Sequence, residues 1–156
     1  MIRRRTMEPN YTAQDIANYF LSKAAKDEEL ISNLKLQKLV YYAQGIHLAY
    51  NGTPIFRDII KAWTYGPVVP TLYRIYKEYG AGGVPADKSF NPKSIDKDMR
   101  EFLDEIYKAF GQFSATRLMD FTHTDQCWKD AHPNGIISHK SMQESLKKYL
   151  KDYKKN

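Results

Sequence analysis

The sequence lacks the residues that would cross-link a small fold or carry it through a membrane. Among its 156 residues there is one cysteine, Cys127, so no disulfide can form within the chain, as is typical of proteins from the reducing cytoplasm. No apolar run approaches the roughly 18 residues that a membrane-spanning helix requires. The basic start, Met1–Arg5, is followed by no apolar stretch, which excludes a secretory signal. We therefore expect a cytoplasmic protein without a membrane partner.

Excess charge is missing from the body of the chain. The net charge is +6. Residues 1–10 contribute +2 (three Arg, one Glu) and residues 140–156 contribute +4 (six Lys, two acidic residues), which leaves residues 11–139 neutral. A nucleic-acid-binding groove needs basic side chains within the fold, so nucleic acid is not an expected partner. We predict a flexible basic arm over residues 1–10, one domain over 11–150 and a basic tail over 151–156.

Signatures of catalysis, metal binding and cofactor binding are absent as well. His123, Cys127, His132 and His139 gather in the C-terminal third, but their spacings match no familiar zinc arrangement and there is no CxxC pair. The glycines at 80, 82 and 83 lack the preceding strand that a phosphate-binding loop requires. We expect no metal, no cofactor and no enzymatic activity. An enzyme that uses His123 and Cys127 as a nucleophile pair stays open as an alternative.

What the sequence does contain is helical periodicity. Thr12-Ala13-Gln14-Asp15 is a capping-box variant that opens a first helix to about residue 25. A second helix is expected from Asn33 to Asn51, ended by Gly52, and its apolar residues cover more than half its circumference. Such a helix is central to a bundle or contacts a partner. Further helices are expected over about 70–79, 96–110, from Ser114, around Trp128 and from Ser138 or Ser141 to about Tyr149.

Short extended segments interrupt this pattern. Residues 54–56 and 59–64 are apolar and suit strands, with Arg57-Asp58 as a turn, so we predict a small β-hairpin. Tyr65-Gly66-Pro67 then forms a stiff elbow, because a proline restricts the residue before it to extended conformations. The predicted fold is mainly α, a single compact helical domain of six or seven helices with a small β-hairpin.

Two blocks of residues resemble one family. The first comprises Lys35–Gly45 (KLQKLVYYAQG), Gly52–Phe56, Ala62–Pro70 and Tyr73, and the second comprises Phe113–Ala115, Leu118, Thr122-His123 and Trp128–Ala131. Together they resemble the Panacea domain of SocA-like and phage-associated antitoxins. One departure is visible, since Cys127 stands where the family usually has a proline before the tryptophan.

The resemblance implies an antitoxin, prophage-associated in many cases, that binds a cognate protein toxin directly. Some members resemble adaptors that deliver the toxin to a ClpXP-type protease, so a proteolytic adaptor stays open as an alternative. Tyrosine and tryptophan are enriched among residues that dominate interface energetics, and Trp63, Tyr65 and Tyr73 lie in or near the elbow. The predicted partner contacts are Tyr41, Gln44, Trp63, Tyr65, Pro67, Val68 and Tyr73.

Overall fold

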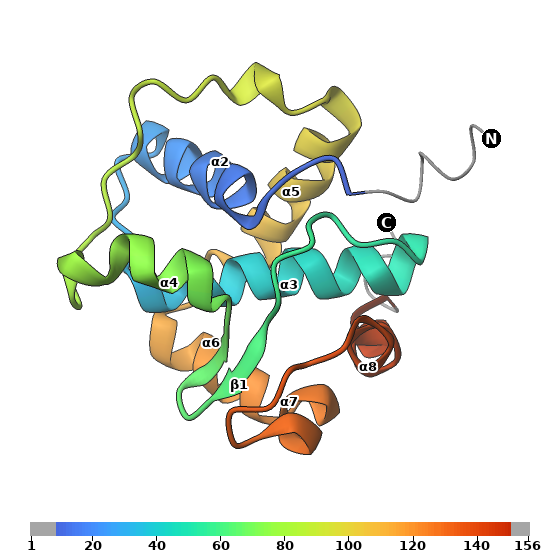
Figure 1. Ribbon diagram of the computed structural model, residues 1–156. Coiled ribbons are helices and arrows are strands. Elements are labelled where there is room, and N and C mark those ends of the chain that lie inside the picture. Colours follow the sequence, from blue (N-terminus) through green and yellow to red (C-terminus); the bar gives the residue numbers. More distant parts are fainter. Residues whose placement is uncertain (1–8, 151–156) are drawn as a thin grey trace.

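The computed structural model describes residues 9–150 (Figure 1). Most of the predicted basic arm and all of the predicted basic tail therefore lie outside the described residues. Within that range the chain forms α-helices, 3-10 helices and one two-stranded hairpin, which confirms the predicted mainly α fold. The α-helices are α2 (Ala13–Lys26), α3 (Asn33–Asn51), α4 (Pro70–Tyr76), α5 (Lys97–Phe110), α6 (Ala115–His123), α7 (Gln126–Ala131) and α8 (His139–Ser145). The strands are β1 (Lys61–Trp63) and β2 (Gly66–Val68), and the 3-10 helices are η1 (Lys77–Tyr79), η2 (Pro92–Ser94) and η3 (Leu146–Tyr149).

Side-chain caps set the helix boundaries. Thr12 and Asp15 form the reciprocal capping box that opens α2. Hydroxyl or carboxylate caps also begin α3, α5, α6 and α8, at Ser32, Asp96, Ser114 and Ser138. Gly52 ends α3 in the left-handed conformation, with a φ of 78°. No helix among residues 9–150 combines the length and the hydrophobicity needed to cross a membrane.

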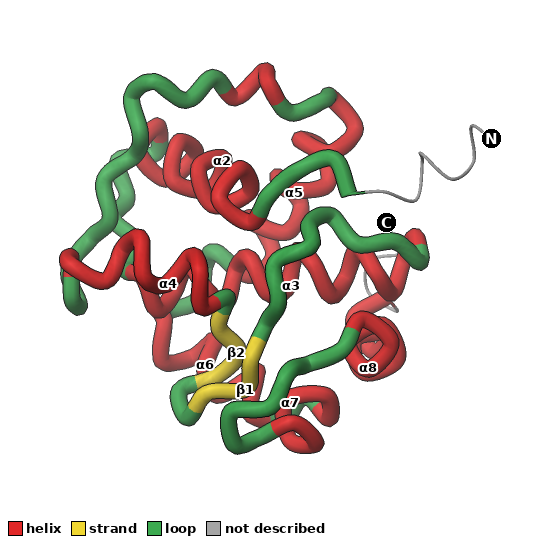
Figure 2. Tube along the Cα trace, in the orientation of Figure 1, coloured by secondary structure: helices red, strands yellow, loops and turns green. Residues whose placement is uncertain are grey.

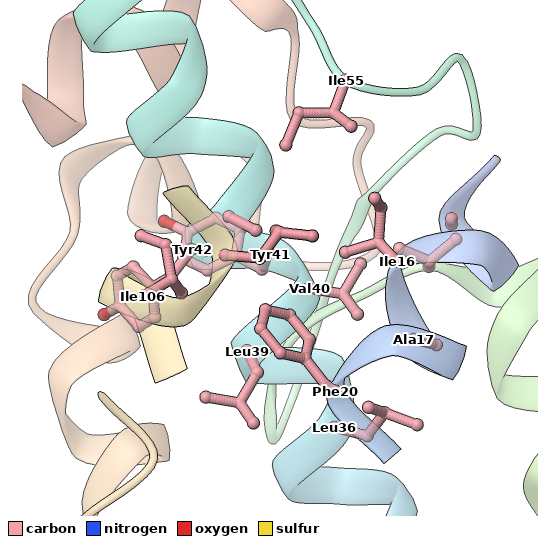
Figure 3. Packing of buried hydrophobic residues seen from close by; sticks show 14 of the residues in the cluster. Ile16, Ala17, Phe20, Leu36, Leu39, Val40, Tyr41, Tyr42, Ile55 and Ile106 are labelled. Carbon is pink, nitrogen blue, oxygen red and sulfur yellow. The ribbon is translucent and has the colours of Figure 1, made fainter. Parts of the chain in front are cut away.

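The long helix α3 is the centre of the fold. It packs against α2 and α5 on one side and against α6 and α8 on the other (Figure 1). Phe20 and Ile16 of α2 meet Leu36 and Val40 of α3 in the core (Figure 3). Because other helices cover α3 on several sides, the apolar residues around its circumference pack mainly in the core.

The hairpin exists, and β1 lies within the predicted strand 59–64, but the prediction of its partner strand was wrong. Lys61 pairs with Val68 and Trp63 pairs with Gly66, so Thr64-Tyr65 is the turn and the predicted elbow begins the second strand (Figure 2). Residues 54–56 do not form a strand. The reason is the buried amide of Gln44, which accepts hydrogen bonds from the N–H groups of Ile55 and Phe56 and donates to the carbonyl of Phe56 at 2.8 Å. Those backbone groups are therefore satisfied by a side chain instead of a neighbouring strand.

A third segment completes this small sheet. The N–H of Ala62 donates to the carbonyl of Gly135 at 2.9 Å, and the N–H of Ile137 donates to the carbonyl of Ile60 at 2.8 Å. The connector from α7 to α8 therefore runs along β1 (Figure 2). The hairpin is thus bounded on its open side by a segment that lies about 70 residues later in the sequence.

Candidate partner-binding site

Two side chains hold the carbonyl groups of the hairpin turn. The indole nitrogen of Trp128 donates to the carbonyl oxygen of Trp63 at 2.9 Å. Nε2 of His123 lies 3.0 Å from the carbonyl oxygen of Thr64. Because a carbonyl oxygen only accepts, the proton must sit on Nε2. Two successive carbonyl groups at the turn are thus fixed by side chains from α6 and α7.

The buried amine of Lys38 contacts the second strand of the hairpin, β2. Lys38 of α3 is fully buried, and its Nζ donates to the carbonyl oxygen of Pro67 at 3.4 Å. Desolvation lowers its pKa to about 7. Gly66 lies directly above it with a φ of 110°, and a Cβ there would come within 2.5 Å of Cε of Lys38 and 2.8 Å of Oγ1 of Thr122. Only glycine fits this position, for conformation as well as for space.

Tyr65 is presented to solvent by this fixed turn. Its side chain is 66% exposed, whereas Gly66 immediately after it is buried. A tyrosine offers a large amphipathic surface with few rotatable bonds, so little conformational entropy is lost when it binds. Holding the backbone beneath it reduces that loss further.

The aromatic surface continues from the turn to α4. The rings of Trp63 and Tyr73 meet edge to face with centroids 5.3 Å apart, and both residues are half-buried. Tyr65, Trp63 and Tyr73 therefore form the accessible part of the predicted contact set. We call these three residues the aromatic tip. Their contact with a partner remains a prediction.

The other four predicted contact residues are buried, namely Tyr41, Gln44, Pro67 and Val68. The hydroxyl of Tyr41 donates to the carboxylate of Asp125 at 2.9 Å, and Gln44 binds the backbone of residues 55 and 56. In the described structure these side chains support the fold around the aromatic tip. A partner would reach them only if the fold opened.

Asp125 is a structural residue that the sequence did not reveal. It is fully buried, and its carboxylate accepts hydrogen bonds from Tyr41, Tyr42 and Tyr149. Nζ of Lys148 lies 2.8 Å from the same carboxylate. These partners compensate the desolvation of a charge. Because they come from α3 and η3, Asp125 connects η3 to the central helix.

The possible nucleophile pair has separate structural roles. Cys127 is buried, its Sγ lies 3.1 Å from the hydroxyl of Tyr41, and burial raises the pKa of the thiol. A raised pKa disfavours the reactive thiolate. His123 is engaged with Thr64 and packs against the ring of Trp128, with centroids 4.3 Å apart. Within residues 9–150, no group of three or more His, Cys, Asp or Glu side chains is arranged to hold a metal ion.

Comparison with known proteins places the chain in a family. It belongs to the SocA-like antitoxins with a Panacea domain, because the model described as "Antitoxin SocA-like, Panacea domain" matches residues 36–129. This range contains most of α3, the hairpin and α6, and the match confirms the resemblance. The chain is 30% identical to Antitoxin SocA of Caulobacter vibrioides (strain NA1000 / CB15N) over 142 residues, which cover 83% of this chain and 75% of that protein. No solved structure gives a significant match.

Family membership favours an antitoxin over an enzyme. The predicted domain boundaries and the predicted partner contacts remain predictions. The partner contacts are argued from the geometry of the hairpin and its surroundings.

Proposed function

We propose that this protein neutralises a cognate protein toxin in the cytoplasm by binding it directly through the aromatic tip. The observation that supports the proposal is the contrast at Tyr65, whose side chain is 66% exposed while the backbone of its turn is held by Trp128 and His123. An exposed aromatic residue on a fixed backbone suits a residue that dominates binding energy.

The size of the fold is compatible with this role. A specific interface buries about 800 Å² on each partner, of which a few aromatic residues supply most of the binding energy. The aromatic tip would be the centre of such an interface, since it joins β1, the turn and α4. The surrounding contacts would mainly exclude water.

Neutralisation by binding requires no chemistry from this chain. The antitoxin would cover the active site of the toxin or hold the toxin in an inactive shape, in a complex of fixed stoichiometry. The amount of antitoxin must then match the amount of toxin, which distinguishes binding from a catalytic mechanism.

Co-expression tests the proposal. The toxin candidate is the product of the open reading frame beside this gene, because toxin and antitoxin are usually encoded together. The wild-type chain should restore growth and copurify with that product. Tyr65→Ser should weaken both effects, whereas Tyr50→Ser, a matched change at an exposed tyrosine at the end of α3, should not. If the product kills equally with and without the wild-type chain, the proposal fails.

A further inference from the structure

Helix α3 holds the second strand of the hairpin through two adjacent side chains. Lys38 donates to the carbonyl of Pro67 at 3.4 Å, and Gln37 accepts a hydrogen bond from the N–H of Val69 at 2.9 Å. Strand β2 begins directly after Tyr65. The bonds from α3 therefore help to fix the position at which the turn presents this tyrosine.

Lys38 differs from the other side chains that hold the hairpin. The indole of Trp128 and the amide of Gln37 do not titrate, and His123 donates from Nε2 whether its ring is neutral or protonated. An ammonium group has three donors, but within residues 9–150 Lys38 makes one hydrogen bond, which is longer than the usual N–H to oxygen distance. A proton on this fully buried amine therefore adds a charge that the fold does not satisfy.

The elements on the hairpin side of Lys38 supply no opposite charge. Within residues 9–150 the amine forms no ion pair. Strand β2 has no ionisable side chain, and the ionisable residues of α6 are Arg117, Asp120 and His123. Arg117 and Asp120 are exposed, and His123 is engaged with the carbonyl of Thr64.

The ionisable neighbours on α3 do not stabilise the charge either. They are Lys35, Tyr41 and Tyr42, all within about one turn of Lys38. Lys35 is itself a cation, and both tyrosines donate to the carboxylate of Asp125. Burial without an opposite charge lowers the pKa of Lys38 to about 7, which favours the uncharged amine above that pH.

Displacement of β2 would bring water to this amine. A Cβ at Gly66 would lie 3.2 Å from Nζ of Lys38, so the backbone of β2 covers the amine directly. Strand β2 is three residues long, whereas α3 and α6 are helices that carry the core residues Leu36 and Leu118. Movement of the strand would therefore hydrate Lys38 without unfolding either helix.

We propose that Lys38 is a positioning residue for Tyr65: as an uncharged amine it keeps β2 on α3 and the tyrosine ready for the toxin, and its protonation releases β2 and weakens toxin binding. A charged amine gains much more from hydration than a neutral one, so protonation favours the released strand. This inference rests on the proposed function and adds its regulation by pH.

Amide hydrogen exchange, followed by NMR in the free chain, tests the movement of β2. The reporter is the N–H of Val69, which donates to Gln37. After correction for the intrinsic exchange rate, its protection in the wild type should rise about tenfold or more from about pH 6.5 to about pH 8.5. It should also open at a lower free energy than global unfolding requires.

Two variants on α3 separate the charge of Lys38 from general effects of pH. In Lys38→Met the protection of the Val69 N–H should no longer vary with pH. Lys35→Met is the matched control, because Lys35 is a nearby lysine whose pKa burial also lowers, but its Nζ donates to Gly111 at the end of α5. This control should keep the pH dependence of the wild type.

Binding to the purified product of the neighbouring open reading frame tests the consequence for Tyr65. The Kd of the wild type should be about threefold or more higher at about pH 6.5 than at about pH 8.5, because less of the chain is competent to bind. Lys38→Met should lose this dependence and Lys35→Met should keep it. The titrating groups of the toxin are common to all three complexes and cancel in the comparison.

The outcomes separate this inference from the proposed function. If the wild-type chain does not bind the product at any pH, both fail. If it binds and Tyr65→Ser weakens binding, but the Kd values of the wild type and Lys38→Met vary equally with pH, the inference is overturned alone. Exchange of the Val69 N–H only through global unfolding, or with the same pH dependence in Lys38→Met, would also overturn it.

Discussion

The indole N–H of Trp128 donates to the carbonyl oxygen of Trp63 at 2.9 Å, across 65 positions of sequence. This bond joins the start of the hairpin turn to α7, and the rings of His123 and His132 both pack against that indole, with centroids 4.3 and 4.5 Å away. The turn is therefore fixed by the indole of Trp128, which is itself packed against His123 and His132.

Replacing Trp128 by phenylalanine should loosen the turn while keeping an aromatic ring between the histidines. Loss of one partly buried hydrogen bond is expected to lower the free energy of unfolding by about 1 kcal/mol. Toxin binding should weaken as well, because Tyr65 would no longer be fixed before contact. Urea unfolding and calorimetry measure the two effects. Full binding by Trp128→Phe would show that the held turn is not needed.

Gly66→Ala should be among the most damaging single substitutions in the hairpin. It introduces a side chain at a φ of 110° and within 2.5 Å of Lys38, so we expect a loss of at least about 2 kcal/mol. Gly80→Ala is the control, because Gly80 also has a positive φ, 56°, but no atom within 4 Å of the added Cβ. Equal unfolding free energies for the two variants would contradict the close approach of Lys38 to the hairpin.

Lys38→Met should change the pH dependence of stability. The pKa of Lys38 is about 7 in the fold against an ordinary value of 10.5, so the unfolded chain binds more protons between these two values. The buried charge of Lys38 therefore lowers the free energy of unfolding of the wild type most strongly below pH 7. This loss shrinks as the pH rises from 7 to 10.5. Below pH 7 the methionine variant should be more stable, by up to about 5 kcal/mol.

The measurement is urea unfolding of both proteins at several pH values from 6 to 10. The difference between them should shrink by up to about 1.4 kcal/mol per pH unit above pH 7. All other titrating groups are common to both proteins and cancel in this comparison. A difference that does not vary with pH would mean that Lys38 keeps its ordinary pKa and is not desolvated.

Cys127→Ala should leave neutralisation intact, with at most a modest loss of stability from the contact with Tyr41. The thiol is buried and its raised pKa keeps it protonated. Growth rescue on co-expression with the toxin provides the measurement. Loss of rescue by a variant that is folded and present at wild-type levels would restore the enzyme alternative built on His123 and Cys127.

The helices could be predicted because their signals are local. Thr12 and Asp15 cap α2 within four residues of sequence, and Gly52 ends α3 at the position where the periodicity stops. The central place of α3 also followed from the width of its apolar surface. Each of these features depends on residues that are neighbours in the chain.

The hairpin strands could not be predicted in the same way. Gln44 binds the backbone of Ile55 from 11 positions away, and Gln37 accepts from the N–H of Val69 across 32 positions at 2.9 Å. A buried glutamine in a helix carries no sequence signal of which distant backbone it will satisfy. The sequence therefore indicated a hairpin and the segment that contains β1, but it placed the partner strand before β1 instead of after it.

The candidate site was predicted in part for the same reason. Trp63, Tyr65 and Tyr73 are exposed or half-buried, whereas Tyr41 is directed to Asp125 by the tertiary structure. Asp125 directly precedes α7, but its side chain makes no capping bond to that helix and accepts hydrogen bonds from distant tyrosines instead.

Neutralisation in a strain that lacks the ClpXP-type protease is the measurement that tests the central claim most directly. Direct binding predicts that the wild-type chain still restores growth there and forms a stable complex with the toxin, and that Tyr65→Ser weakens both effects. A proteolytic adaptor would instead lose its effect in that strain. Lethality despite expression of both wild-type proteins, with the toxin uninhibited, would contradict neutralisation by direct binding.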